Sequence, residues 1–176
     1  MIVGLDTNIL CYALDPAFPE HDSLSRLLVD LSPENVIALN PTVIHEVYHV
    51  LVFYLEWFPE EAARRLSMLL KHPYVEFFSQ TKNTCRIALR LSVQHKLGGR
   101  DALIVANFLA NKVPTVYTHD QELLKLERLS WKNNRVTFKD PLTGTTVEPK
   151  STSLDHASRQ PRLQRRKITS QAPQKP

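Results

Sequence analysis

Short apolar runs alternate with longer segments of helical periodicity along residues 1–140. Apolar runs of four or five residues, the length of buried strands, lie at Ile2–Leu5, Val36–Leu39, Tyr74–Phe78, Thr115–Thr118 and Arg135–Phe138. The intervening segments predict helices over Ser23–Leu31, Thr42–Trp57, Pro59–Lys71, Thr84–Leu97, Arg100–Asn111 and Gln121–Leu129. This alternation predicts an α/β fold in which helices cover both faces of a parallel sheet.

Charge is distributed unevenly along the chain. The net charge is +4, but residues 149–176 carry seven basic side chains and one acidic side chain, which gives +6. Residues 1–148 hold 15 basic and 17 acidic side chains, or −2. The last segment is also rich in Pro, Ser and Gln, so it buries too little apolar surface to offset the entropy of ordering. We therefore expect one folded domain over residues 1–148 and a disordered basic tail over residues 149–176.

The cysteines and the apolar stretches indicate the cellular compartment of the protein. Cys11 and Cys85 are too few for a disulfide framework and are expected to be free thiols in a reducing cytosol. The N-terminus lacks the basic region of a signal peptide and reaches an acid at Asp6. The longest apolar stretch, Val43–Phe58, is interrupted by His and Glu and is too short for a membrane span. These features predict a cytoplasmic protein with no membrane association.

Four acids are expected at one end of the predicted sheet. Asp6 follows the first strand and Asp120 follows the fourth, and ligands of parallel sheets bind beyond these carboxyl ends. Asp101 opens a helix after Gly98-Gly99, and Glu46 lies near the start of its own helix. A single acid at such a position is more often a helix cap than a functional group. Four acids that converge on one edge point to function.

The chemistry of this set favours a hard cation. Four carboxylates a few ångströms apart repel one another unless a cation neutralises them. Oxygen ligands without cysteine suit Mg²⁺ or Mn²⁺ rather than a structural zinc ion.

Three segments resemble the PIN-domain family. Leu5-Asp6-Thr7-Asn8-Ile9-Leu10 is similar to the opening "DTN" motif of these domains. The segments 100–106 (RDALIVA) and 113–120 (VPTVYTHD) are similar to their C-terminal half, and Glu46 falls where the family places its helix-borne acid. The resemblance covers roughly residues 1–140, with the motifs in the family's order.

The resemblance implies a three-layer α/β/α sandwich around the parallel sheet and metal-dependent cleavage of single-stranded or looped RNA. It assigns the catalytic metal site to four acids, Asp6, Glu46, Asp101 and Asp120, with Mg²⁺ or Mn²⁺ as cofactor. It also implies support from Thr7, Asn8 and Thr118 by hydrogen bonding and suggests Glu122 as a further acid. Attack by water with loss of the 3′-oxygen would leave 5′-phosphate and 3′-hydroxyl ends. In size the chain is most similar to VapC-type toxins, which implies an antitoxin protein as partner beside the RNA substrate.

A competing motif lies across the second acid. His45-Glu46-Val47-Tyr48-His49 matches the H-E-x-x-H pattern of zinc metalloproteases, in which both His bind zinc and the Glu is the general base. The chain lacks the downstream G-x-x-H of metzincins, and a protease does not account for the other three acids. We favour exposed helix histidines beside a nuclease acid. A PIN nuclease that is not a toxin, and an inactive RNA-binding module, stay open as alternatives.

Two further features have two interpretations each. The aromatic residues of 53–58, namely Phe53, Tyr54, Trp57 and Phe58, are assigned to core packing, with a partner or homodimer surface as the alternative. The basic tail either binds RNA phosphates without sequence preference or is a solvated extension.

Overall fold

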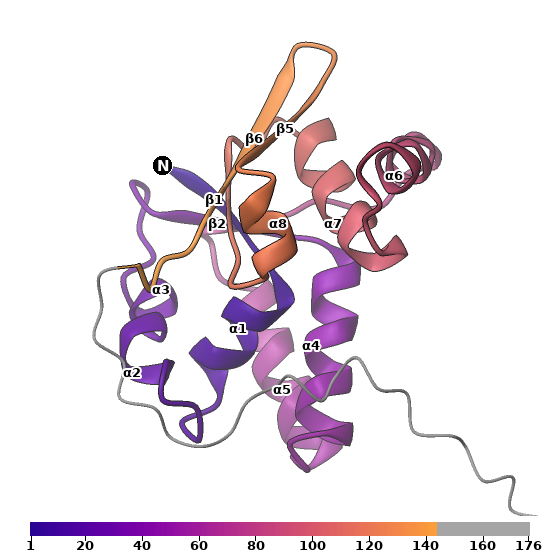
Figure 1. The fold of residues 1–176 in the computed structure, drawn as a ribbon. Coiled ribbons are helices and arrows are strands. Elements are labelled where there is room, and N and C mark those ends of the chain that lie inside the picture. Colours follow the sequence, from indigo (N-terminus) through magenta and orange to yellow (C-terminus); the bar gives the residue numbers. More distant parts are fainter. Residues whose placement is uncertain (144–176) are drawn as a thin grey trace, which may run out of the picture.

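A computed structural model describes residues 1–143 of the chain (Figure 1). Its centre is a six-stranded sheet in the order β3-β2-β1-β4-β6-β5. All neighbouring strands are parallel except the pair β5–β6, which is antiparallel. The strands are β1 (Ile2–Leu5), β2 (Val36–Leu39), β3 (Val75–Phe77), β4 (Thr115–Tyr117), β5 (Arg128–Trp131) and β6 (Asn134–Lys139).

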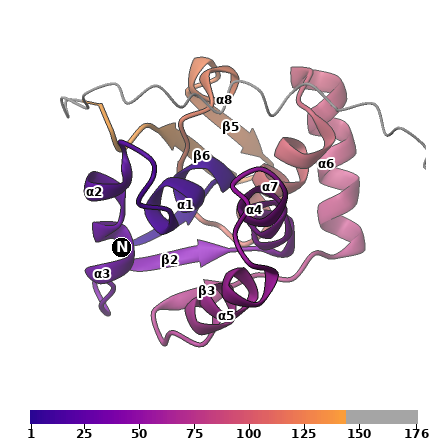
Figure 2. The same cartoon turned by 90° about the horizontal axis from the view of Figure 1, so that it is seen from below.

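Helices lie on both sides of this sheet (Figures 1 and 2). They are α1 (Thr7–Leu14), α2 (His21–Leu24), α3 (Arg26–Val29), α4 (Pro41–Phe53), α5 (Pro59–Leu70), α6 (Lys82–His95), α7 (Gly99–Ala110) and α8 (Gln121–Lys125). The chain adds β2 and β3 on one side of β1 and then returns to add β4 on the other. With right-handed crossovers this reversal places the α1–α5 group and the α6–α7 pair on opposite faces. The predicted three-layer α/β/α sandwich is therefore confirmed.

The first strand passes close beneath α7. A Cβ atom on Gly4 would lie only 2.9 Å from the Phe108 ring, so this position in β1 accepts no side chain. Phe108 is fully buried, as are Leu5 in β1 and Val105 in α7. This close packing holds the start of α7 beside the end of β1, where two of the predicted site acids lie.

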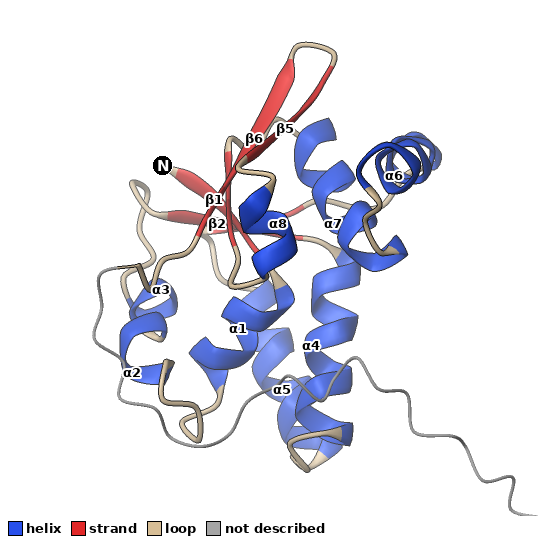
Figure 3. Cartoon of the chain, in the orientation of Figure 1, coloured by secondary structure: helices blue, strands red, loops and turns tan. Residues whose placement is uncertain are grey.

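Most predicted elements agree with the structure to within a few residues, two do not, and one helix was not predicted (Figure 3). The sequence pattern assigned no helix to α1, because residues 9–14 are all buried and show no alternation between apolar and polar faces. The predicted helix Ser23–Leu31 is instead two short helices, α2 and α3. The predicted helix Gln121–Leu129 is wrong beyond Lys125, because residues 128–131 form β5 and pair with β6.

The antiparallel pair β5–β6 adds a hairpin to one edge of the predicted parallel sheet. Leu129 in β5 is buried opposite Val136 in β6, and this cross-strand contact overrides the helical pattern of the segment. The hairpin lies at one edge of the sheet, away from the ends of β1 and β2. It leaves the parallel centre of the sheet as predicted.

Both cysteines are free, with Cys11 buried and Cys85 exposed. Among residues 1–143 no helix is both long and apolar enough to cross a bilayer. The predicted basic tail, residues 149–176, lies outside the described residues.

Candidate metal centre

Asp6 lies at the carboxyl end of β1 and caps α1. Its Oδ1 accepts the backbone N–H of Thr7 at 2.8 Å, and its Oδ2 accepts the Thr118 hydroxyl at 2.7 Å. Only 6% of the residue is exposed. These two contacts hold the Asp6 carboxylate in one orientation at the edge of the sheet.

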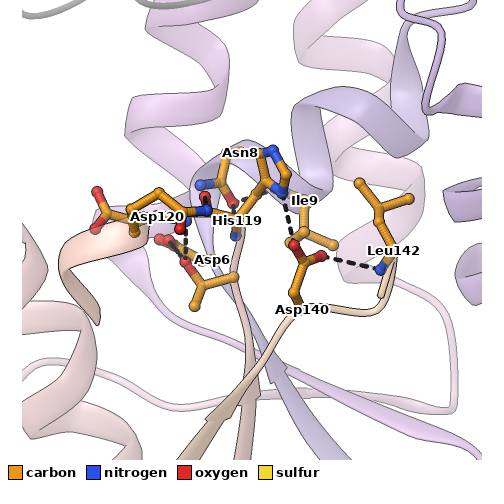
Figure 4. Close-up of polar contacts among 9 residues, drawn as sticks. Asp6, Asn8, Ile9, His119, Asp120, Asp140 and Leu142 are labelled. Carbon is orange, nitrogen blue, oxygen red and sulfur yellow. Dashed lines mark hydrogen bonds and ion pairs between the residues drawn. The ribbon is translucent and has the colours of Figure 1, made fainter. Parts of the chain in front are cut away.

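Asp120 follows β4, the neighbouring strand, and caps α8. Its Oδ1 accepts the backbone N–H groups of Glu122 and Leu123 at 2.7 and 3.0 Å. The backbone N–H of Asp120 donates to the Thr118 hydroxyl oxygen at 3.0 Å, so Thr118 contacts both acids. Figure 4 shows Asp6 and Asp120 close to each other. The predicted supporting position of Thr118 is where the structure places it.

Glu46 reaches the same region from the second turn of α4. Its Oε2 accepts the Thr7 hydroxyl at 2.8 Å, and its Oε1 forms an ion pair with the Arg100 guanidinium at 2.7 Å. The Glu46 side chain is 16% exposed, whereas that of Arg100 is 71% exposed. Arg100 therefore approaches Glu46 from the solvent side.

Asp101 lies in the first turn of α7, where the helix dipole favours negative charge. Gly98 caps this helix, and a Cβ atom there would lie 2.8 Å from Oδ2 of Asp101. The φ angle of Gly98 is −56°, so the backbone itself tolerates any residue. A side chain at position 98 would therefore displace the Asp101 carboxylate.

Burial and mutual repulsion perturb the carboxyl groups of this cluster. Burial raises the pKa of Asp6 to about 7, and the charges of Asp101 and Glu46 add to this increase. The hydrogen bonds from Thr118 and Thr7 act in the opposite direction and lower the pKa. Burial, together with the charges of Asp120 and Glu46, raises the pKa of Asp101 to about 6. Each of the four acids thus interacts electrostatically with at least one other. The structure brings the predicted set together.

This donor set fits a divalent cation with a preference for oxygen ligands. Burial without a cation is unfavourable for Asp6 and Asp101, and a bound divalent ion would remove that cost. In the described part of the chain no three acids, histidines or cysteines form a ready ligand shell. Glu46 is also paired with Arg100, and Oδ1 of Asp120 accepts two N–H groups, so a cation would compete with these contacts for the two carboxylates.

A second polar group lies beside the acids (Figure 4). Asn8 accepts the backbone N–H of Ile9 at 2.7 Å and that of His119 at 3.3 Å, so it joins the ends of β1 and β4. Nδ1 of His119 lies 2.9 Å from Oδ2 of Asp140, which follows β6. The structure thus places Asn8 between the strand ends that carry Asp6 and Asp120, and its supporting role at the site stays a prediction. His119 and Asp140 were not predicted, although Asp140 follows a parallel strand just as Asp120 does.

Glu122 lies apart from the acids in the structure. Its side chain is 77% exposed and pairs with Lys125 at 2.6 Å. Its backbone N–H, rather than its carboxylate, contacts Asp120.

A family model of the PIN domain matches residues 3–129, which is most of the chain. The chain belongs to the PIN-domain family. The matched segment contains the four acids Asp6, Glu46, Asp101 and Asp120 and ends within β5. No curated protein matches this sequence.

Solved structures with a similar fold include toxins and toxin–antitoxin complexes. The PIN domain matches VapC20 of Mycobacterium tuberculosis, a toxin that cleaves the sarcin-ricin loop, with a TM-score of 0.58 and 18% identity over 68% of this chain and 90% of that one. It matches VapBC2 of Rickettsia felis, solved with promoter DNA, with a TM-score of 0.58 and 22% identity over 80% of this chain and 100% of that one. FitAcB of Neisseria gonorrhoeae gives a TM-score of 0.53 and 18% identity over 80% and 98%. At these identities the likeness shows a shared fold.

The two histidines of the H-E-x-x-H motif are not arranged as in a zinc site. His45 and His49 lie on the exposed side of α4 and line a groove with Glu46 and Arg100. Within residues 1–143 no further ligand joins them in a metal-binding group. The preferred interpretation, exposed histidines beside a site acid, agrees with their exposure.

The assignment of residues 53–58 to the core is wrong for three of the four aromatic side chains. Phe53, Tyr54 and Phe58 are 65%, 41% and 81% exposed. Trp57 is partly buried and donates its indole N–H to Asp15 at 2.9 Å. The helix ends at Phe53, so the following residues leave the apolar face that the helical pattern extrapolates.

Proposed function

We propose that this PIN domain is a divalent-metal-dependent endoribonuclease whose metal ligands are Asp6, Glu46, Asp101 and Asp120. The observation that carries the proposal is the convergence of the four acids at the carboxyl edge of the sheet, where Thr7 and Thr118 link them and where burial and neighbouring charges raise the pKa of two of them. A fold has no structural use for acids that destabilise one another. A module that only binds RNA has no need of them either.

The residues of the chain support hydrolysis of a phosphodiester in distinct ways. A bound Mg²⁺ or Mn²⁺ would lower the pKa of a coordinated water and offset charge on the phosphate. Thr118 and Thr7 fix the orientation of Asp6 and Glu46, which limits the reorganisation needed when a cation binds. Arg100, on the solvent side of Glu46, is placed to neutralise charge on an incoming phosphate.

The fold comparisons support RNA as the substrate and an antitoxin as the partner. One similar structure is a toxin that cleaves an RNA loop, and others are solved as toxin–antitoxin complexes. We propose the same pairing for this chain. A free ribonuclease of this kind would damage the cell that makes it, so expression of the chain alone is expected to arrest growth.

Substitution of Asp101 by Asn tests the ribonuclease assignment. Asp101→Asn keeps the shape of the side chain and removes a charge that binds metal, so RNA cleavage with Mg²⁺ or Mn²⁺ should fall by roughly a hundredfold or more. EDTA should abolish cleavage by the wild-type protein. Asp22→Asn, an exposed aspartate on α2, is the matched control and should cleave as the wild type does. Undiminished cleavage by folded Asp101→Asn would refute the proposed site.

A further inference from the structure

A groove of about 470 Å³ begins at the acidic cluster and follows α4. It is lined by Pro41, Thr42, His45, Glu46, His49 and Arg100. Its volume falls within the range of sites that hold small organic groups. Because Glu46 belongs to both the groove and the acidic cluster, a molecule in the groove lies directly beside the proposed site of cleavage.

The end of the groove nearest the acids carries hydrogen-bond donors. Arg100 uses one guanidinium nitrogen on Glu46 and is 71% exposed, so the remaining N–H groups of its fork are available. The Thr42 hydroxyl accepts a hydrogen bond from the Gln80 amide at 3.1 Å, which leaves its own O–H to donate. His45 is exposed on the same side of α4. Apart from Glu46, the groove has no acidic lining residue.

The other end of the groove carries exposed aromatic rings. The His49 and Phe53 rings lie with centroids 4.9 Å apart and planes inclined by 34°. The Tyr54 ring meets His49 edge-on at 5.5 Å. Phe53 and Tyr54 are 65% and 41% exposed, so this ring cluster presents aromatic surface to solvent. Flat exposed rings of this kind are the platforms on which unpaired bases stack.

The two ends of the groove are separated along the axis of α4. Glu46 and Phe53 are seven residues apart in one helix, which places them about 10 Å apart along its axis at ~1.5 Å per residue. Donors for a phosphate thus lie at one end and stacking surfaces at the other. A protein helix would require an apolar stripe along the whole groove, and Arg100, Glu46 and His45 interrupt such a stripe.

We propose that this groove is a subsite for single-stranded RNA, in which Arg100 binds a backbone phosphate and the His49–Phe53 pair stacks an unpaired base next to the cleavage site. The subsite rests on the proposed ribonuclease function and names the residues that contact the backbone and an unpaired base beside the cleavage site. It also gives a role to His49 of the H-E-x-x-H motif, which the acidic site does not use.

The test measures binding without cleavage. The full chain carrying Asp101→Asn is titrated, in EDTA, against a short fluorescein-labelled single-stranded RNA and against the same sequence as a duplex. Adding His49→Ala should raise the Kd for the single strand about tenfold, in the range of one lost base–aromatic stack. His49→Phe retains a flat ring and should stay within about twofold of the parent. The Kd for the duplex should not change, because its bases are already paired.

Arg100→Gln tests the phosphate contact. It should flatten the plot of log Kd against log salt concentration by about 0.7, the increment for one phosphate contact to a single strand. Two exposed residues of α6 that do not line the groove serve as matched controls. His95→Ala and Arg86→Gln should leave Kd and slope unchanged.

Several results would overturn the proposal. The proposal is wrong if His49→Ala leaves the Kd for the single strand unchanged. It is also wrong if His49→Ala weakens the affinity for single strand and duplex equally, or if His49→Phe weakens the affinity for the single strand as much as His49→Ala does. An unchanged salt slope in Arg100→Gln would remove the phosphate contact and leave the groove to a protein partner. Because no RNA is cut in this assay, its outcome is separate from that of the Asp101→Asn cleavage test.

Discussion

The clearest thermodynamic consequence of the acidic cluster is that the metal-free domain should become less stable as the pH rises. Folding raises the pKa of Asp6 from 3.8 to about 7. Between these values the folded protein holds a proton that the unfolded chain has released, so the free energy of unfolding falls with increasing pH. Above about pH 7 the decrease is complete. Asp101, whose pKa is raised to about 6, acts in the same direction.

The size of the effect follows from the pKa difference. About three units at ~1.36 kcal/mol each give about 4 kcal/mol of destabilisation by ionised Asp6 at pH 8. Asp6→Asn removes this charge but places an amide where the carboxylate accepts hydrogen bonds from Thr118 and Thr7. That mismatch costs about 2 kcal/mol. In EDTA at pH 8, Asp6→Asn is therefore expected to be about 2 kcal/mol more stable than the wild type, or roughly 6 °C higher in Tm.

Thermal and denaturant unfolding in EDTA between about pH 5 and pH 8 measures this difference. The wild type should lose stability over the range, and Asp6→Asn should lose less of it. Mn²⁺ should increase the free energy of unfolding of the wild type by RT ln(1 + [Mn²⁺]/Kd) and should stabilise Asp6→Asn less. The exposed Asp22→Asn is the control and should follow the wild type. If Asp6→Asn is no more stable than the wild type at pH 8 and has the same pH profile, the account of Asp6 as a strained carboxylate is wrong.

Two further predictions concern the geometry of the site and its consequence in cells. Gly98→Ala should displace the Asp101 carboxylate and lower RNA cleavage about tenfold or more, with little change in Tm. Gly99→Ala is the control and should not lower cleavage, because a Cβ there meets nothing within 4 Å. Equal activity of the two variants would argue against crowding at Gly98. Induced expression of the chain without an antitoxin should arrest growth. The Asp101→Asn variant should relieve the arrest, and the control variant Asp22→Asn should not. Arrest that persists in Asp101→Asn would mean that toxicity does not arise from the acidic site.

The candidate acids were accessible from the sequence because their positions follow from local pattern and one topological rule. Strands β1 and β2 have the predicted bounds, and Asp6 follows the first of them directly. Carboxyl ends of parallel strands share one edge of a sheet, so an acid after β1 and an acid after β4 must lie near each other. Asp140, after β6, satisfies the same rule and was missed because the predicted last strand stopped at Phe138.

The partners of these acids depend on contacts between residues far apart in the chain, and hydrophobic periodicity does not contain that information. Thr118 and Asp6 are 112 residues apart, and Glu46 meets Thr7 across 39 residues. Arg100 pairs with Glu46 only because the start of α7 packs beside α4. The same holds for the RNA groove, whose lining comes from both helices.

Periodicity reports which residues leave water, so the sequence by itself determined the α/β class, the sheet's central strands and the edge at which the acids gather. Periodicity does not report which other element covers the residues that leave water. Helix α1, buried on nearly every side, and strand β5, paired with β6, were decided by tertiary packing. Tertiary packing also decided the environment of Asp6, because a carboxyl pKa of about 7 arises from burial of its side chain in the folded domain.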